Sequence, residues 1–288
     1  MNKPRVVILG GGFAGLTAAR AISALGNFEV MIVDRNNFQT FLPLLYQVST
    51  SGLAADHVAY PIRGALRKSG IDFRMGSPIS IDHKNKSIKL DSSETFNFDY
   101  LVFALGSVTN DFGIKGVNEH ALGMKSVQDA LHIRSTILRY FEDLCRFNEK
   151  SDVVINIVGG GPTGVEMAGA IAELRNGPLK RDSELAANQM KINIIEAGKN
   201  ILPMFSQKLS SRAEKDLLKL GVMVKKDKIV KEINSKEVKF KDGSSLTSDI
   251  TIWTAGVTGE PTFEKLKLPE ERGRILVDGT LQVKNYPY

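Results

Sequence analysis

The stretch Arg5-Val-Val-Ile-Leu-Gly-Gly-Gly-Phe-Ala-Gly15 places a run of aliphatic residues directly before a glycine-rich turn. An Ala- and Leu-rich segment, predicted to be a helix, follows up to about residue 25, and residues 29–34 have the pattern of a second strand. The pattern recurs with an offset of 149 residues (Gly159 against Gly10), as strand 153–158, turn 159–164, helix 165–174 and strand 191–196. Two such units predict an α/β chain with two Rossmann-like, dinucleotide-binding domains.

The glycine spacing in both turns fits phosphate binding. The first glycine permits a tight turn, the second leaves room for a pyrophosphate, and the third allows the helix to pack closely on the strand. With 26 glycines in 288 residues, chance alone predicts roughly 0.2 such matches in the chain, so two matches in strand–turn–helix context are specific. The three places are filled by Gly10, Gly12 and Gly15 in the first turn, and by Gly159, Gly161 and Gly164 in the second.

An acidic residue ends the second strand of each unit. Asp34 follows Gly15 by 19 residues, and Glu196 follows Gly164 by 32 residues across a polar insertion at 175–191. A carboxylate at this place accepts hydrogen bonds from the ribose 2′-hydroxyl and repels a 2′-phosphate. Glu196 therefore favours NADH over NADPH, and the alternative interpretation is a solvated acid at a strand end.

Each unit has further strands behind it. Residues 99–106 and 249–256 resemble each other and end in glycine. Shorter alternating segments are predicted to form a small antiparallel layer on each parallel sheet. Amphipathic helices are predicted for residues 126–147, with Ser126 as N-cap, and for residues 206–220, closed by Gly221. The segments of the two antiparallel layers are 77–82, 86–90 and 95–98 in the first half, and 222–226, 229–233, 237–240 and 244–248 in the second.

Composition excludes several classes of protein. The net charge of +6 and pI near 9.2 favour anionic partners such as nucleotides or membrane surfaces, although a mildly basic surface explains them equally well. Four scattered histidines and a single cysteine argue against a metal site, and Cys145 is expected to be packed inside a helix. The Lys-rich stretch at 225–231 has no interleaved aromatics, so no nucleic-acid partner is expected. Neither a signal peptide nor a spanning segment is predicted.

Four motifs resemble the type II NADH dehydrogenases, single-subunit NADH:quinone oxidoreductases of the two-dinucleotide-binding-domain flavoprotein superfamily. The resemblance covers essentially the whole chain. Related disulphide reductases and sulfide:quinone reductases use paired cysteines, which this sequence lacks. The motifs are Phe41-Leu-Pro-Leu-Leu-Tyr-Gln-Val-Ser-Thr-Ser-Gly52, Gly164-Val-Glu-Met-Ala-Gly169, Glu196-Ala-Gly-Lys-Asn-Ile-Leu-Pro203 and Ile252-Trp-Thr-Ala-Gly-Val257.

The resemblance implies FAD in a first domain (residues 1–112 and 258–288) and NADH in a second (113–257). It implies that Glu166 lies near the junction of nicotinamide and flavin; the alternative is an acid favoured by the helix dipole. Residues 43–47 are expected beside the flavin, and Pro78 near a backbone contact to adenine departs from the family pattern, since proline cannot donate. The other cofactor-binding residues that the motifs imply are Phe13, Ala14, Arg35, Pro43, Gln47, Thr50, Ile79, Ala104, Gly106, Pro162, Thr163, Ala255 and Gly256.

The family continues beyond a segment like residues 281–287 into a Gly-Asp motif and a C-terminal part that lines the quinone site and attaches to the membrane. The sequence is therefore interpreted as a fragment, itself soluble, of a peripheral respiratory enzyme on the cytoplasmic side of the inner membrane, with a quinone as acceptor and a homodimer left open. The alternatives are a soluble NAD(P)H-dependent reductase for ferredoxin or rubredoxin, and a nucleotide-binding fragment without catalysis.

Overall fold

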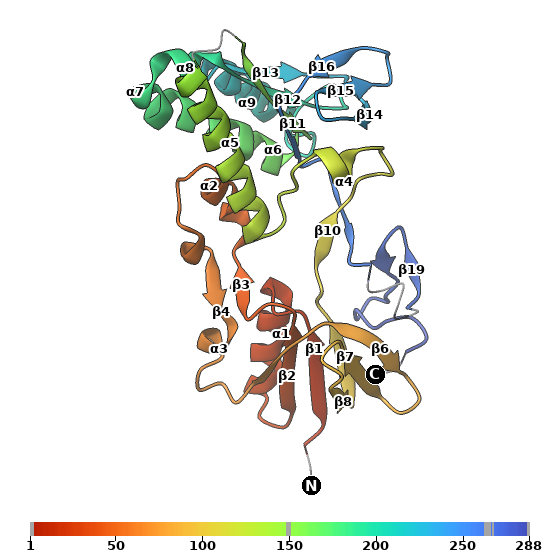
Figure 1. Ribbon diagram of the computed structural model, residues 1–288. Coiled ribbons are helices and arrows are strands. Elements are labelled where there is room, and N and C mark those ends of the chain that lie inside the picture. Colours follow the sequence, from red (N-terminus) through yellow and green to blue (C-terminus); the bar gives the residue numbers. More distant parts are fainter. Residues whose placement is uncertain (1–2, 148–150, 262–265, 267, 287–288) are drawn as a thin grey trace. The chain divides into compact units, whose positions relative to one another are not determined.

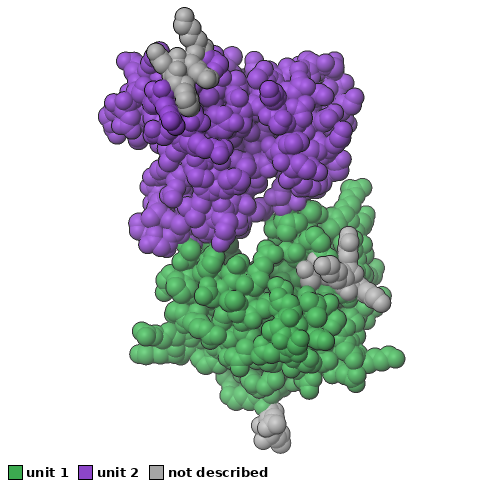
Figure 2. All heavy atoms as spheres, viewed as in Figure 1, with its two compact units in different colours: residues 1–41, 59–108, 257–288 green, residues 42–58, 109–256 purple. Residues whose placement is uncertain are grey.

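The computed structural model describes residues 3–147, 151–261, 266 and 268–286, which form two compact units (Figure 2). The chain passes between the units more than once, so each unit combines segments that are distant in sequence. Unit 1 comprises Met1–Phe41, Ala59–Val108 and Val257–Tyr288, and unit 2 comprises Leu42–Val58 and Thr109–Gly256.

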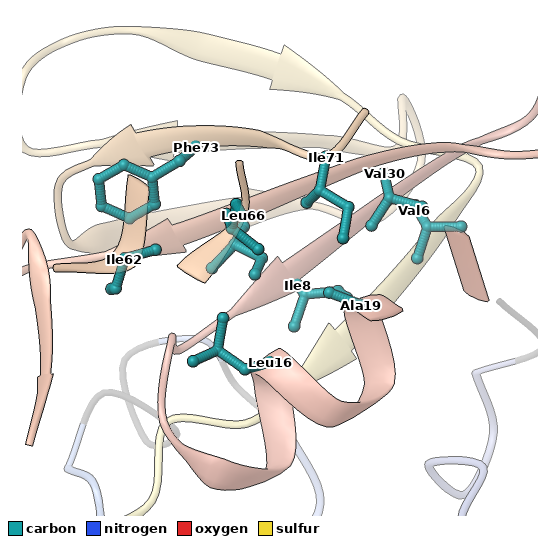
Figure 3. Close-up of a cluster of buried hydrophobic side chains, with 10 residues drawn as sticks. Val6, Ile8, Leu16, Ala19, Val30, Ile62, Leu66, Ile71 and Phe73 are labelled. Atoms are coloured by element: carbon teal, nitrogen blue, oxygen red, sulfur yellow. The ribbon is translucent and has the colours of Figure 1, made fainter. Parts of the chain in front are cut away.

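Unit 1 is built on a four-stranded parallel sheet in the order β5-β2-β1-β9. Its two central strands, β1 and β2, lie beside helix α1 (Figure 1). These strands are almost wholly apolar because both faces of the sheet are covered. Val6 and Ile8 contact helix α1 on one face, where Leu16 and Ala19 point toward the sheet (Figure 3), and Val7 and Leu9 face the antiparallel layer. The elements of this core are β1 (Arg5–Leu9), α1 (Phe13–Ala24), β2 (Glu29–Asp34), α3 (Ile62–Ala65), β5 (Asp72–Met75) and β9 (Tyr100–Phe103).

The predicted antiparallel layer of unit 1 is confirmed. It consists of three strands in the order β6-β7-β8. Short two-stranded ribbons, β3 with β4, β10 with β18 and β19 with β20, complete the region. The bounds are β3 (Phe38–Thr40), β4 (Ala59–Pro61), β6 (Pro78–Asp82), β7 (Ser87–Leu90), β8 (Thr95–Asn97), β10 (Ser107–Thr109), β18 (Val257–Gly259), β19 (Glu270–Glu271) and β20 (Arg274–Ile275).

Unit 2 repeats this plan with a parallel sheet in the order β13-β12-β11-β17 and an antiparallel layer β14-β15-β16. The sheet interior holds a polar pair, because Asn156 on β11 lies in register with Asn193 on β12. The Asn193 amide donates to Asn156 Oδ1 at 2.9 Å, and the Asn156 amide donates to the Thr247 carbonyl at 2.9 Å, which ties the sheet to its layer. The strands are β11 (Val153–Val158), β12 (Met190–Ile195), β13 (Val222–Lys225), β14 (Val230–Ile233), β15 (Glu237–Phe240), β16 (Ser245–Thr247) and β17 (Ile250–Trp253).

The helices of unit 2 include the two predicted amphipathic ones. Ser126 does cap α5, since its Oγ accepts the Asp129 N–H at 3.1 Å, and Gly221 follows α9 with a φ of +79°. Among the described residues, no helix combines the length and the apolar character that crossing a membrane requires. The helices are η1 (Leu42–Leu44), α2 (Leu45–Ser49), η2 (Ala55–His57), α4 (Val117–His120), α5 (Val127–Phe147), α6 (Pro162–Leu174), the π-helix η3 (Arg175–Leu179), α7 (Lys180–Asp182), α8 (Glu184–Gln189) and α9 (Gln207–Lys219).

Two sequence-based expectations about structure were wrong, and one segment had been given no predicted structure. Residues 222–226 were assigned to the antiparallel layer, but β13 is the edge strand of the parallel sheet, where one-sided burial produces the same alternation. The polar insertion at 175–191 is largely helical. Cys145 is exposed, because the buried stripe of α5 runs through Ile137, Phe141 and Leu144 and leaves it on the flank.

Candidate nucleotide-binding sites

The second glycine turn is held in place by close backbone packing. Gly159 has a φ of +114°, and a Cβ there would lie 2.7 Å from the Cα of Ala255 on the neighbouring strand end. A Cβ on Gly164 would fall on the carbonyl oxygen of Gly159. The first and third glycines therefore allow β11, β17 and α6 to approach one another.

Gly161 has a different role. It is the N-cap residue of α6 with φ −73° and ψ −178°, a conformation that any residue can adopt, and no atom lies within 4 Å of a Cβ built there. Pro162 occupies the first helical position, and the first turn contains no acidic side chain. The backbone N–H groups of Thr163 and Gly164 therefore begin a helix in front of open space, which suits an anionic phosphate.

The strand-end carboxylate also fastens the glycine turn. Glu196 accepts the Gly160 N–H on Oε2 at 2.7 Å and the Gly198 N–H on Oε1 at 2.6 Å. A Cβ on Gly160 would lie 2.7 Å from that same Oε2, so a larger residue there would displace the carboxylate. Each carboxylate oxygen has two lone pairs and can still accept from a ribose hydroxyl. The sequence analysis identified Glu196 but not its partner Gly160.

A cavity of about 340 Å³ lies beside this turn, entirely within unit 2. It reaches the size of small-molecule sites, which are mostly apolar with a few polar groups. Of the predicted residues, Gly159, Glu196 and Ala255 line it; Gly256 packs against the Phe112 ring at its edge. The sequence analysis did not identify the other lining residues, which are Phe112, Ile114, Val158, Ile195, Ala197, Lys228, Ile229, Val230, Lys241 and Trp253.

The first glycine turn repeats this geometry in unit 1. Asp34 accepts the Gly11 N–H on Oδ2 at 2.6 Å and the Asn36 N–H on Oδ1 at 2.8 Å. A Cβ on Gly12 would meet nothing within 4 Å, whereas one on Gly15 would fall on the Gly10 carbonyl oxygen. The first turn thus also leaves open space in front of a helix start, here that of α1.

The other residues of unit 1 that were predicted to bind a cofactor differ in their exposure and contacts. Phe13 is exposed and makes an edge-on contact with Phe41, with ring centroids 5.5 Å apart. Arg35 forms an ion pair with Glu260 at 3.6 Å. Ile79 is 47% exposed and lies where the register of β6 shifts, a bulge of the kind that often borders functional sites. The remaining predicted residues are Ala14, which is exposed, Ala104, whose N–H donates to the Leu9 carbonyl at 2.7 Å, and Gly106, with a φ of +75°.

Comparison with known proteins identifies the family. Residues 4–287 match the pyridine nucleotide-disulphide oxidoreductase family. The chain is 30% identical to the type II NADH:quinone oxidoreductase of Staphylococcus aureus over 99% of its own length and 72% of that protein. The chain belongs to the type II NADH:quinone oxidoreductases. It is also 32% identical to the Mycobacterium tuberculosis enzyme Ndh, covering 99% of this chain and 65% of Ndh.

A solved structure agrees with this assignment. NDH2 from Plasmodium falciparum, determined in complex with NADH, superposes with a TM-score of 0.91 at 26% identity, covering 99% of this chain and 62% of that one. The sulfide:quinone oxidoreductase of Aquifex aeolicus shares the fold at 19% identity and a TM-score of 0.80. The chain thus spans less than two thirds of the length of several relatives.

The family motif at residues 41–52 lies in unit 2 from residue 42 onward. Leu45 and Val48 of α2 are buried there, and Ser49 Oγ contacts Met167 Sδ of α6 at 3.4 Å. Thr50 is buried, and its hydroxyl donates to the Tyr46 carbonyl at 2.9 Å, so it has lone pairs but no second proton to offer a cofactor.

The other two residues predicted in this segment differ in exposure. Pro43 is exposed in η1. The Gln47 carbonyl accepts from the N–H groups of Gly52 and Leu53, and its half-buried side-chain amide donates to the Tyr46 hydroxyl at 3.2 Å.

Glu166 lies in α6 beyond the first turn, where the helix dipole is no longer strongly felt. The interpretation as a dipole-stabilised acid therefore loses its physical basis. The side chain is exposed, and partial desolvation raises the pKa of the carboxyl above its ordinary value. This direction is typical of acids at functional sites, and the functional role of Glu166 stays a prediction.

Proposed function

We propose that this chain is the nucleotide-binding part of an NADH:quinone oxidoreductase, with FAD held by unit 1 and NADH by unit 2. The observation that carries the proposal is that the same glycine-turn geometry occurs in both units. Each unit places an open glycine at a helix start and a carboxylate at the adjacent strand end, which together match a phosphate and a ribose. Relatives named for NADH and quinone support the assignment of substrates.

The residues of unit 1 fit the FAD pyrophosphate and ribose, with Gly12 and the N–H groups of Phe13 and Ala14 toward the phosphates and Asp34 toward the ribose. The residues of unit 2 fit NADH in the same way, through Gly161, Thr163 and Glu196. When bound, the flavin supplies the redox chemistry, taking a hydride from NADH and passing two electrons onward. The protein binds and orients both nucleotides.

The acceptor is proposed to be a membrane quinone. The sequence contains one cysteine, so no cysteine pair within the chain can relay electrons. Attachment to the cytoplasmic side of the membrane belongs to the same proposal, as does homodimer formation. The net charge of +6 favours an anionic lipid surface.

The test of the acceptor compares electron carriers directly. Flavin-loaded protein mixed with NADH is expected to reduce a water-soluble quinone and to leave ferredoxin and rubredoxin oxidised. Reduction of the iron–sulfur carriers without reduction of the quinone would instead show the soluble reductase.

Replacing Glu196 should weaken discrimination against NADPH. Removing the carboxylate charge removes its repulsion of a 2′-phosphate, and we expect the NADPH-to-NADH affinity ratio to rise about 10-fold or more, equivalent to about 1.4 kcal/mol. Titration calorimetry of Glu196→Ala and Glu196→Gln measures both affinities. The glutamine variant keeps an acceptor for the glycine turn, so a ratio that does not move in either variant would contradict the ribose assignment.

Replacing Glu166 with glutamine should slow reduction of the bound flavin at saturating NADH by about 10-fold or more, with NADH affinity little changed. Because the pKa of Glu166 is raised, the wild-type rate should approach that of the variant as pH falls through that pKa and the charge is lost. Stopped-flow absorbance measures the rate. Glu173→Gln, an exposed acid on the same helix, is the matched control, and an equal effect of both substitutions would rule out a specific role.

A further inference from the structure

Phe112 adopts an unusual backbone conformation at the edge of the unit 2 cavity. Its φ is +52°, in the left-handed region that bulky residues rarely occupy. The Phe112 N–H donates to Asn110 Oδ1 at 2.8 Å. Asn110 is itself tied to the end of β17, since its N–H donates to the Gly256 carbonyl at 3.1 Å and its carbonyl accepts from Trp253 Nε1 at 2.8 Å. The surrounding hydrogen bonds therefore impose this conformation, as is common at ligand sites.

The strained backbone presents the aromatic ring at the cavity. The ring lies against Gly256, where an added Cβ would be 2.6 Å from the Phe112 Cζ atom, so only glycine leaves the ring its place. Phe112 lines the cavity and is still 59% exposed. A large aromatic side chain that is fixed on one side and open on the other suits contact with a flat ligand.

The rest of the cavity indicates which part of a dinucleotide lies there. Gly159, which lines the cavity, belongs to the turn that suits the pyrophosphate, and Glu196, which also lines it, suits the adenosine ribose. The remaining wall includes the apolar side chains of Ile229 and Ala255 together with Lys228 and Lys241. The base attached to that ribose is the adenine, whose flat aromatic faces suit contact with such a wall.

We propose that the Phe112 ring is the surface on which the adenine of the dinucleotide stacks. The inference rests on the proposed function, because it takes NADH as the ligand of this cavity. Stacking of a base on an aromatic side chain contributes roughly 5- to 150-fold in affinity. Phe112 is then a residue that selects adenine dinucleotides and touches no reacting atom.

The test compares ligands that have or lack the adenine. Phe112→Leu keeps an apolar side chain at the same φ but removes the aromatic face, and Phe112→Tyr keeps that face. Calorimetry is expected to show affinity for NADH and for ADP-ribose falling about 10-fold in the leucine variant and staying within 2-fold of wild type in the tyrosine variant. The affinity for reduced nicotinamide mononucleotide, which has no adenine, should be unchanged in both.

Each outcome decides the matter. Unchanged ADP-ribose affinity in Phe112→Leu overturns the stacking inference while leaving wild-type binding, and so the proposed function, in place. Equal losses for ADP-ribose and for the mononucleotide also overturn it, because Phe112 would then only support the local structure. Wild-type protein that binds neither NADH nor ADP-ribose contradicts the proposed function and the inference together.

Discussion

NADH affinity should fall about 100-fold or more when Gly161 is replaced by valine, while the fold is retained. The backbone of Gly161 is in an extended conformation open to any residue, and a Cβ there meets no protein atom. The valine side chain would instead occupy the space in front of the helix start. Losing two charge-assisted hydrogen bonds to phosphate, at about 1.5–3 kcal/mol each, corresponds to a loss of this size.

The equivalent glycine turn of unit 1 provides the control for this experiment. Gly12→Val changes the equivalent open position of unit 1 and should lower FAD affinity without changing ADP-ribose binding to unit 2. Calorimetry measures binding, and circular dichroism on heating checks that both variants fold. Normal NADH affinity in Gly161→Val would contradict the assignment of this turn to the pyrophosphate.

Replacing Gly164 with alanine should destabilise the protein by about 3 kcal/mol or more. The new Cβ would fall on the carbonyl oxygen of Gly159, so α6 and β11 would have to separate. At roughly 2–4 °C per kcal/mol for a domain of this size, the melting temperature should drop by about 10 °C. Thermal unfolding followed by circular dichroism measures the change.

Gly169 on the same helix provides the opposite expectation. No atom lies within 4 Å of a Cβ at that position, so Gly169→Ala should stabilise the helix by about 0.5–1 kcal/mol. The two substitutions are chemically identical and should differ in sign. If Gly164→Ala left the melting temperature unchanged, the close helix–strand contact would be wrong.

The glycine turns and the strands that flank them were predictable because their pattern is local. The aliphatic run of β1, the glycines and the following helix lie within twenty residues, and the spacing alone fixes their order. Asp34 was found by its spacing from the glycine turn, and Glu196, which follows its turn at a longer spacing, was found by its place at the end of the second strand. Their second role, accepting from Gly11 and Gly160, could not be seen because the hydrogen bonds form only when separate strands come together.

The two wrong predictions, for residues 222–226 and for Cys145, both concern elements that are buried on one side only. β13 alternates like an antiparallel strand because it is at the sheet edge, and only its pairing with β12 shows that it is parallel. Cys145 is adjacent in sequence to the buried stripe of α5, and a small rotation of the helix decides its exposure.

Phe112 could not be predicted as a site residue from the composition or from the hydrophobic periodicity of the sequence. Its left-handed conformation and its contact with Gly256 depend on a loop that meets a strand 143 residues away, through the hydrogen bond from Trp253 to Asn110.

The most direct test of the account is the visible absorption spectrum of the purified protein with FAD, recorded before and after addition of NADH without oxygen. The account predicts a bound-flavin spectrum that bleaches on addition of NADH, and a Gly161→Val variant that needs about 100-fold more NADH for the same initial rate of bleaching, because the two glycine turns bind the two nucleotides of one reaction. A protein that binds FAD and NADH but leaves the flavin oxidised would contradict it.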